Sequence, residues 1–190
     1  ATFPTVKKAV NPVPPEPKPK CLTFYSQCGL KGTSYEVCSS VSSIPDDKRQ
    51  IAGFISGKFE GTVVIPFTQE GCRDNSFYQL DHSVACFNNV GMGSYTNNVR
   101  SLLIMTEIQV TKGCIKVFDD SCFTGNFKEI CNDIPNLSTI GWDKKIGSVK
   151  IGEGVRGFSP YTDIDYYGTY TSFGQDSWGL SNPFFRSEEH

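Results

Sequence analysis

From Cys21 onward the chain alternates apolar and polar residues in short runs, as at 22–25, 34–38, 115–118 and 148–151. Alternation with a period of two is typical of half-buried β-strands, because successive side chains point to opposite faces of a sheet. Glycine-containing turns separate the runs, and no stretch keeps helical spacing over three turns. The pattern predicts an all-β fold made of hairpins, as in a sandwich or a barrel.

The first 20 residues differ from the rest of the chain. They hold six prolines with lysines between them and show no apolar periodicity. This composition favours an extended polyproline II backbone that is solvated along its length. We therefore expect residues 1–20 to be a disordered Pro-rich tail that acts as a spacer, or alternatively as a docking strip.

A long internal repeat divides the chain after residue 20 into two parts. The segment Cys21–Cys38 aligns with the segment Cys114–Cys131, so that three cysteines, an aromatic residue and a glycine coincide after a single-residue gap. Self-similarity at a fixed period indicates duplicated structural units. The repeat predicts two domains, at 21–108 and 113–190, joined by a short link at 109–112.

A finer repeat has the spacing aromatic, four residues, large apolar, one residue, glycine. Its four copies begin at Tyr25, Phe67, Phe118 and Tyr161, and the copy at Phe67 ends in Asp74 instead of glycine. The spacing predicts a hairpin folded over on itself, in which the glycine adopts a backbone conformation that a Cβ atom opposes. Aspartate tolerates such a conformation better than most residues.

This fourfold spacing resembles the Greek-key signature of the βγ-crystallin superfamily. Residues 23–40 look like the opening motif of a vertebrate γ-crystallin, and residues 91–104 look like the end of its second motif. The resemblance implies two tandem βγ-crystallin-like Greek-key sandwich domains, each a pair of packed four-stranded sheets. It also implies a protein without catalytic activity.

Many members of this family bind calcium through loops that read Asn or Asp, Asn or Asp, two residues, Ser or Thr, and Ser. Such oxygen donors suit calcium, which takes six or more ligands. Residues 97–101 read Asn-Asn-Val-Arg-Ser and match the first five positions, with Leu102 at the sixth. The loop 52–57 keeps only a serine, whereas the loop 143–148 lacks the hydroxyl ligand and carries two lysines.

The resemblance therefore implies one weak calcium site in the first domain and no site in the second. Its candidate ligands are Asn97, Asn98, Ser101 and Ser56. The alternative is that Asn97 and Asn98 only cap a turn. We expect no other cofactor.

Eight cysteines without a CxxC pair, together with only two histidines, favour disulfides over a metal site. Disulfides indicate an oxidising compartment, so we expect a secreted, extracellular protein. The midpoints of Cys21–Cys38 and of Cys114–Cys131 both fall at hairpin turns, which predicts one cross-strand disulfide in each hairpin.

The other four cysteines are harder to assign, because spacing does not fix connectivity. We expect Cys72 to join Cys86, which leaves Cys28 and Cys122 either to pair with each other or to stay free. The triplet Asn136-Leu137-Ser138 is a candidate glycosylation site in a surface loop.

Charge and motifs exclude several functions. A net charge of -2 and a pI near 5.7 provide no basic surface for nucleic acid. No run is long and apolar enough for a membrane span. His82 is the only histidine inside the chain, and no nucleophile motif accompanies it, so we expect a surface loop residue rather than a general base.

The sequence thus favours a non-catalytic secreted structural or binding protein that contacts extracellular matrix, other copies of itself or a small ligand. The aromatic-rich stretch 161–185 supports a first alternative, an extracellular binder of a small apolar, pigment or glycan ligand. A secreted toxin or antimicrobial factor is the second alternative.

Overall fold

The computed structural model describes residues 21–51, 53–56, 63–73, 78–105 and 108–177. The Pro-rich tail expected at 1–20 lies outside the described residues, as does the C-terminal part of the aromatic-rich stretch. The described strands are β1 (Leu22–Gln27), β2 (Lys31–Val37), β3 (Gly53–Ser56), β4 (Val63–Phe67), β5 (Ser101–Met105), β6 (Ile115–Phe118), β7 (Phe127–Ile130) and β8 (Ser148–Ile151).

Five short 3-10 helices connect the described strands, at η1 (Asp46–Lys48), η2 (Phe87–Val90), η3 (Gly93–Tyr95), η4 (Leu137–Ile140) and η5 (Ile164–Tyr166). The described part of the chain holds no α-helix, so the prediction of an all-β fold is confirmed. It also offers no helix of the length and apolarity that a membrane crossing requires.

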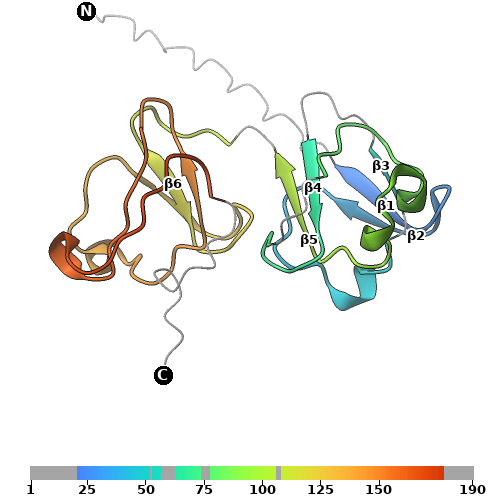
Figure 1. The fold of residues 1–190 in the computed structure, drawn as a ribbon, viewed down its shortest axis with the longest axis horizontal. Coiled ribbons are helices and arrows are strands. Elements are labelled where there is room, and N and C mark those ends of the chain that lie inside the picture. The colour runs from blue at the N-terminus through green and yellow to red at the C-terminus, as the bar shows by residue number, and fades with distance from the viewer. Residues whose placement is uncertain (1–20, 52, 57–62, 74–77, 106–107, 178–190) are drawn as a thin grey trace, which may run out of the picture.

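The eight described strands form three antiparallel sheets, with the orders β2-β1-β3, β4-β5 and β7-β6-β8. Figure 1 shows two lobes, with β1 to β5 in one and β6 in the other. We call residues 21–105 the N-terminal lobe and residues 108–177 the C-terminal lobe. The domain boundary expected at 109–112 stays a prediction.

Within each lobe, a segment of one motif pairs with the other motif. Val41, which follows β2, forms a bridge with Leu102 of β5. In the C-terminal lobe, Val149 of β8 forms a bridge with Ser177. Exchange of this kind ties two consecutive motifs into one unit, as the Greek-key resemblance implies.

The repeated turn has the same backbone geometry in each copy. Two consecutive residues adopt positive φ angles, at Gly29-Leu30, Gly71-Cys72, Cys122-Phe123 and Asp165-Tyr166. In three copies a glycine with φ between 81 and 84° follows, at Gly32, Gly125 and Gly168. The prediction for the glycine is therefore confirmed, whereas the positive φ of the large apolar residue is a feature that the spacing did not reveal.

The side chain that follows the aromatic residue closes each of these three turns. The hydroxyl of Ser26 accepts a hydrogen bond from the Thr33 N–H, seven residues further on, at 2.9 Å. Asp119 and Thr162 accept equivalent bonds at 2.7 and 3.1 Å. A Cβ atom at Gly125 would lie 2.1 Å from the Asp119 carboxylate. The missing side chain of the glycine is what makes room for this hydrogen bond.

Among the described residues, apolar side chains pack in three clusters. The N-terminal lobe has the largest, which includes Phe24, Tyr95 and Leu102. The C-terminal lobe has a smaller cluster in which Val117, Ile146 and Val149 are buried and the other described members are only partly buried. The third cluster joins the lobes; its buried members are Ile65, Phe67, Cys72, Leu103 and Cys122.

Candidate functional site

The structure joins Cys21 to Cys38 and Cys114 to Cys131, with Cα atoms 4.0 and 4.1 Å apart. Strand register explains both pairs. Leu22 of β1 lies opposite Val37 of β2, so the next residues outward along the two strands are the two cysteines. The register of β6 and β7 brings Cys114 and Cys131 together in the same way.

The expected Cys72–Cys86 disulfide is wrong. Cys86 pairs with Cys28, and Cys72 pairs with Cys122, so all eight cysteines are bonded. The N–H of Gly29 donates to the Ala85 carbonyl at 2.8 Å, and this bond holds the first hairpin turn against the segment that carries Cys86. The turn that carries Cys72 faces the C-terminal lobe instead.

The Cys72–Cys122 disulfide lies inside the cluster between the lobes. Cys122 is fully buried, and Cys72 is 3% exposed. A hydrogen bond of 2.7 Å from the Ser42 hydroxyl to the Asp120 carboxylate also crosses from one lobe to the other. Covalent, apolar and polar contacts therefore coincide at this junction.

The structure shifts the positions of the expected calcium loop by one residue relative to the sequence match. The hydroxyl of Ser101 donates to the Gln69 carbonyl at 2.6 Å and accepts from the Cys72 N–H at 2.9 Å. Ser148 makes the same two bonds to the turn that follows β6, at 2.6 and 3.1 Å. Both serines are fully buried. Ser101 and Ser148 therefore occupy equivalent positions in their motifs. Because Ser148 is the sixth and last residue of the loop 143–148, Ser101 is the last residue of its own loop.

With Ser101 at the last position, the hydroxyl-ligand position of the loop falls on Arg100. A guanidinium in this position repels a cation instead of coordinating it. The two Asn or Asp positions fall on Thr96 and Asn97, so the loop contributes one amide and no carboxylate. Neutral donors next to a positive charge are a poor set for calcium.

Asn97 and Asn98 act as turn residues. Asn97 has a φ of 55°, and its N–H donates to the Ile51 carbonyl at 2.8 Å. The side-chain amide of Asn98 donates to the Ser94 carbonyl at 3.2 Å. These contacts agree with the alternative in which the two asparagines only cap a turn.

Ser56 lies away from this loop. Strand register places Gly53 opposite Tyr25, just as Ser148 lies opposite Phe118, so Gly53 holds the place of the serine in the first motif. Ser56 is three positions further along β3, which corresponds to about 10 Å of extended chain. The register therefore places Ser56 outside the ligand position of the first motif, and the donors of residues 96–101 are a poor set for a calcium ion.

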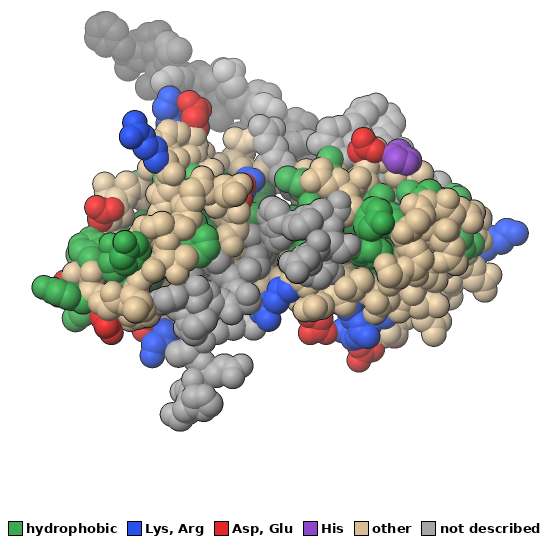
Figure 2. Space-filling view, viewed as in Figure 1, with side chains coloured by type: hydrophobic (Ala, Val, Ile, Leu, Met, Phe, Trp, Pro, Cys, Tyr) green, Lys and Arg blue, Asp and Glu red, His purple; other side chains and the backbone are tan. Residues whose placement is uncertain are grey.

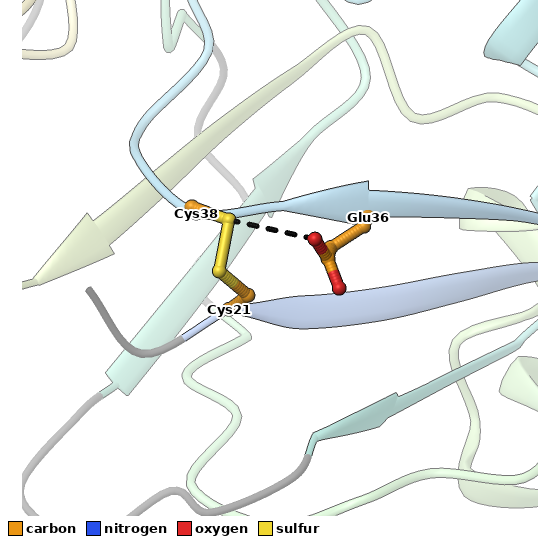
Figure 3. A group of neighbouring side chains, drawn as sticks. All are labelled: Cys21, Glu36 and Cys38. Atoms are coloured by element: carbon orange, nitrogen blue, oxygen red, sulfur yellow. Dashed lines mark hydrogen bonds between the residues drawn. A yellow bond between two sulfur atoms is a disulfide. The ribbon is translucent and has the colours of Figure 1, made fainter. Parts of the chain in front are cut away.

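One group of three metal-ligating residue types occurs in the described part of the chain, at Cys21, Glu36 and Cys38. Figure 3 shows the two sulfurs bonded to each other, with the Glu36 carboxylate beside them. A disulfide has no thiolate to offer a metal, so this group belongs to the hairpin and not to a metal site.

The remaining candidates lie on the surface. The His82 side chain is 72% exposed and contacts the Asp81 carboxylate at 2.7 Å. This contact lowers the pKa of Asp81 through its hydrogen bond to the histidine. Asn136 of the candidate glycosylation site is the N-cap of η4, and its Oδ1 accepts from the Ser138 N–H at 3.0 Å.

A patch of exposed apolar side chains covers the turn of the last hairpin. It consists of Ile164, Tyr166, Tyr167 and Tyr170, of which Tyr167 is 72% exposed. Figure 2 shows hydrophobic side chains at the end of the C-terminal lobe where Figure 1 places η5. We call these four residues the aromatic patch. Desolvation raises the pKa of Tyr166, and the carboxylates of Asp133 and Asp165 add to the effect.

Comparison with known proteins decides the family. Residues 114–183 match the family model Beta/Gamma crystallin. This part of the chain belongs to the βγ-crystallin superfamily. A curated relative of this βγ-crystallin is Beta-crystallin A3 of Bos taurus, which is 25% identical over 181 residues and aligns over 88% of this chain and 83% of its own length.

Two solved structures resemble this βγ-crystallin at low identity. Protein S complexed with calcium is 13% identical and has a TM-score of 0.35, with coverage of 85% of this chain and 92% of its own. Geodin, a βγ-crystallin from Geodia cydonium, is 17% identical, also with a TM-score of 0.35 and with coverage of 85% and 88%. Scores this low do not transfer the geometry of a site, so the calcium of Protein S is a property of that protein alone.

Proposed function

We propose that this βγ-crystallin is a non-catalytic structural protein of an oxidising, extracellular compartment, and that disulfides rather than a bound cation stabilise its fold. The observation that carries the proposal is the Cys72–Cys122 bond at the centre of the cluster between the lobes. A cross-link there holds both halves of the chain in one arrangement.

The pairing of all eight cysteines in disulfides supports an oxidising, extracellular compartment. Disulfides persist in extracellular fluids and are reduced in the cytosol. Two of the four bonds close the hairpins β1–β2 and β6–β7, while the other two connect segments 50 and 58 residues apart. Bonds over such distances stabilise a fold mainly by restricting the unfolded chain.

Surface chemistry supports the absence of catalysis. The His82 ring is largely exposed and is paired with its neighbour Asp81, and no desolvated cleft surrounds it among the described residues. The buried hydroxyls of Ser101 and Ser148 are engaged in turn contacts, which leaves neither as a nucleophile.

Calorimetry of the full chain with calcium, with chelator and with reductant tests this proposal. We expect reductant to lower the Tm strongly and calcium at about 1 mM to leave it unchanged. A site with a Kd of about 0.1 mM would add about 1.4 kcal/mol of stability at that concentration. A calcium-dependent rise in Tm, or a Tm that reductant does not change, contradicts the proposal.

The aromatic patch favours a second function, the binding of an extracellular glycan. Tyrosine rings stack on sugar faces, and carboxylates such as Asp163 and Asp165 accept bonds from sugar hydroxyls. We expect Tyr167→Ala to abolish binding to a glycan array. Phe127→Ala is the matched control, because Phe127 is 62% exposed and lies on β7, outside the patch. Absence of any glycan signal from the unmodified chain removes this candidate.

A further inference from the structure

A cavity of about 390 Å³ opens on the N-terminal lobe beside the turn that follows β4. The described residues that line it are Thr68, Gln69, Glu70, Arg73 and Arg100. A water molecule takes up about 30 Å³ in the liquid, so the cavity has room for a hydrated ion or for one group of a larger molecule. These lining residues are all polar, and they include two arginines and one carboxylate.

The two arginines come from segments that are joined by hydrogen bonds. Arg73 directly follows Cys72, and Arg100 directly precedes Ser101. The Cys72 N–H donates to the Ser101 hydroxyl at 2.9 Å, and this hydroxyl donates to the Gln69 carbonyl at 2.6 Å. Both arginines are half-buried, so their guanidinium groups are held at the cavity rather than spread into solvent.

The side chain of Arg73 has an unfilled hydrogen-bonding group. Its Nε is buried and has no hydrogen-bond partner among the described residues. A Cβ atom at Gly71 would lie 3.1 Å from this Nε and 3.3 Å from the Ser121 hydroxyl, so the missing side chain of Gly71 makes room for the guanidinium. Removal of a charged N–H from water without a new partner costs free energy. An anionic acceptor at this guanidinium would recover that cost.

The carboxylate at the cavity is already paired with a third arginine. Glu70 accepts a hydrogen bond from Arg49 at 2.5 Å, and Arg49 also contacts Asp46 at 2.7 Å. The hydrogen bond from Arg49 is the main reason that the pKa of Glu70 is lowered, whereas the charge of Arg100 has the smallest effect. Within the described ranges, neither Arg73 nor Arg100 takes part in an ion pair. Among these residues, the two guanidinium charges therefore have no counter-charge of their own.

The equivalent turn of the C-terminal lobe lacks both arginines. Arg100 and Gly147 hold equivalent positions, because each N–H donates to the carbonyl of the aromatic residue that opens the motif, at 2.8 and 2.7 Å. A Cβ atom at Gly147 would lie 2.6 Å from the backbone of Asp120, so a side chain does not fit there. Thr124 holds the place of Arg73. The pair of guanidinium groups is therefore not a consequence of the repeated motif.

We propose that this cavity is a binding site for a tetrahedral oxyanion, a sulfate or phosphate group, held between Arg73 and Arg100. Guanidinium groups bind such anions through two parallel N–H···O bonds, and these charge-assisted bonds are about twice as strong as neutral ones. The Nε–H of Arg73 is one arm of such a fork, and the side-chain amide of Gln69 supplies a further donor. The charge of Arg100, which repels a cation from the expected calcium loop, attracts an anion to the cavity.

Two sources supply this chemistry outside the cell, namely free inorganic anions and the sulfate groups of glycan chains. Gln69 and Glu70 at the cavity are exposed. A sulfate group carried on a larger molecule therefore reaches the guanidinium groups as a free ion does. The site requires the same two arginines in both cases.

Titration of the full chain with inorganic sulfate at constant ionic strength tests the proposal. Heteronuclear NMR of the arginine Nε–H groups provides the readout. We expect the signals of Arg73 and Arg100 to shift along one saturation curve and the signal of Arg156 to stay in place, because Arg156 lies on the exposed surface of the other lobe. Inorganic phosphate should give the same pattern. This measurement on the unmodified chain does not depend on how any variant folds.

Substitutions identify the groups that bind the anion. Arg73→Gln and Arg100→Gln should each lower the affinity for sulfate by about tenfold or more, because each removes charge-assisted hydrogen bonds. Arg156→Gln is the matched control and should bind sulfate as the unmodified chain does. Glu70→Gln should bind sulfate more tightly, because it removes a carboxylate that repels the anion.

A sulfated oligosaccharide and its desulfated counterpart distinguish the two sources. Tighter binding of the sulfated oligosaccharide than of inorganic sulfate, with the same dependence on Arg73 and Arg100, assigns the site to a glycan. Equal affinities assign it to the free ion. The proposal is overturned if the Arg73 and Arg100 signals do not move with sulfate or phosphate, or if Arg73→Gln and Arg100→Gln leave the affinity unchanged.

Discussion

Removal of the Cys72–Cys122 disulfide should uncouple the two lobes. The bond connects positions 50 residues apart, and none of the other three disulfides shortens the path between them. Loop closure of that length restricts the unfolded chain by about 4 kcal/mol. Alanine is the replacement of choice, because a serine hydroxyl at these buried positions would have to find a new hydrogen-bond partner.

Guanidinium unfolding of the Cys72→Ala/Cys122→Ala variant without reductant measures this effect. We expect the unmodified chain to unfold in one transition and the variant to unfold in two. Far-UV circular dichroism follows both lobes, while fluorescence of Trp142 follows the C-terminal lobe, whose cluster it packs against.

The Cys21→Ala/Cys38→Ala variant is the control for the loss of a disulfide as such. Its bond spans 17 residues at the outer end of β1 and β2, and it is expected to stabilise by about 3 kcal/mol without joining the lobes. This variant should lose stability but keep a single transition. If the Cys72→Ala/Cys122→Ala variant also keeps a single transition with an unchanged midpoint, the disulfide does not couple the lobes and the reasoning is refuted.

Two further predictions concern single residues. Gly125→Ala should lose about 2 kcal/mol more stability than Gly141→Ala in chemical denaturation, because both positions have positive φ but only the first would place a Cβ atom 2.1 Å from Asp119; equal losses would contradict this. Hydrogen bonds from Thr111 lower the pKa of Glu129 from the usual 4.5, so its stabilisation is present above that pH and disappears as pH falls through the lowered pKa. Glu129→Gln should therefore lower the Tm at pH 7 but not at pH 2, and an equal decrease at both pH values would exclude this linkage.

The local repeat could be predicted from the sequence because its determinants lie close together in the chain. An aromatic residue, an apolar residue and a glycine within eight positions define three of the four folded hairpins, and the glycine has the expected positive φ at Gly32, Gly125 and Gly168. The two hairpin cysteine pairs depend on the same local register. No information about distant segments is needed for either feature.

The other two disulfides depend on which turns meet in space, and spacing contains no such information. Cys72 and Cys86 are near each other in sequence, yet Cys86 lies against the first hairpin turn while Cys72 lies against the other lobe. A comparison of the turns would have helped, since Cys72 and Cys122 both occupy the positive-φ pair of the repeat. Cys72 is the second residue of its pair and Cys122 is the first, so the cross-link joins neighbouring positions of two facing turns.

The calcium loop shows how a one-residue ambiguity changes a functional interpretation. Residues 97–101 match a calcium motif when Ser101 is taken as its fifth position. Hydrogen bonds fix Ser101 at the sixth position instead, because the hydroxyl bonds to the turn of its own hairpin as Ser148 does. The position of the hydroxyl ligand then belongs to Arg100, and the motif no longer suits a cation.

The Cys72–Cys122 disulfide joins two residues with strained backbone angles. Cys72 and Cys122 have φ angles of 55 and 61°, and a non-glycine residue in this region costs about 1 kcal/mol. The disulfide between them is expected to stabilise the chain by about 4 kcal/mol, so it more than offsets the conformational penalty of both residues.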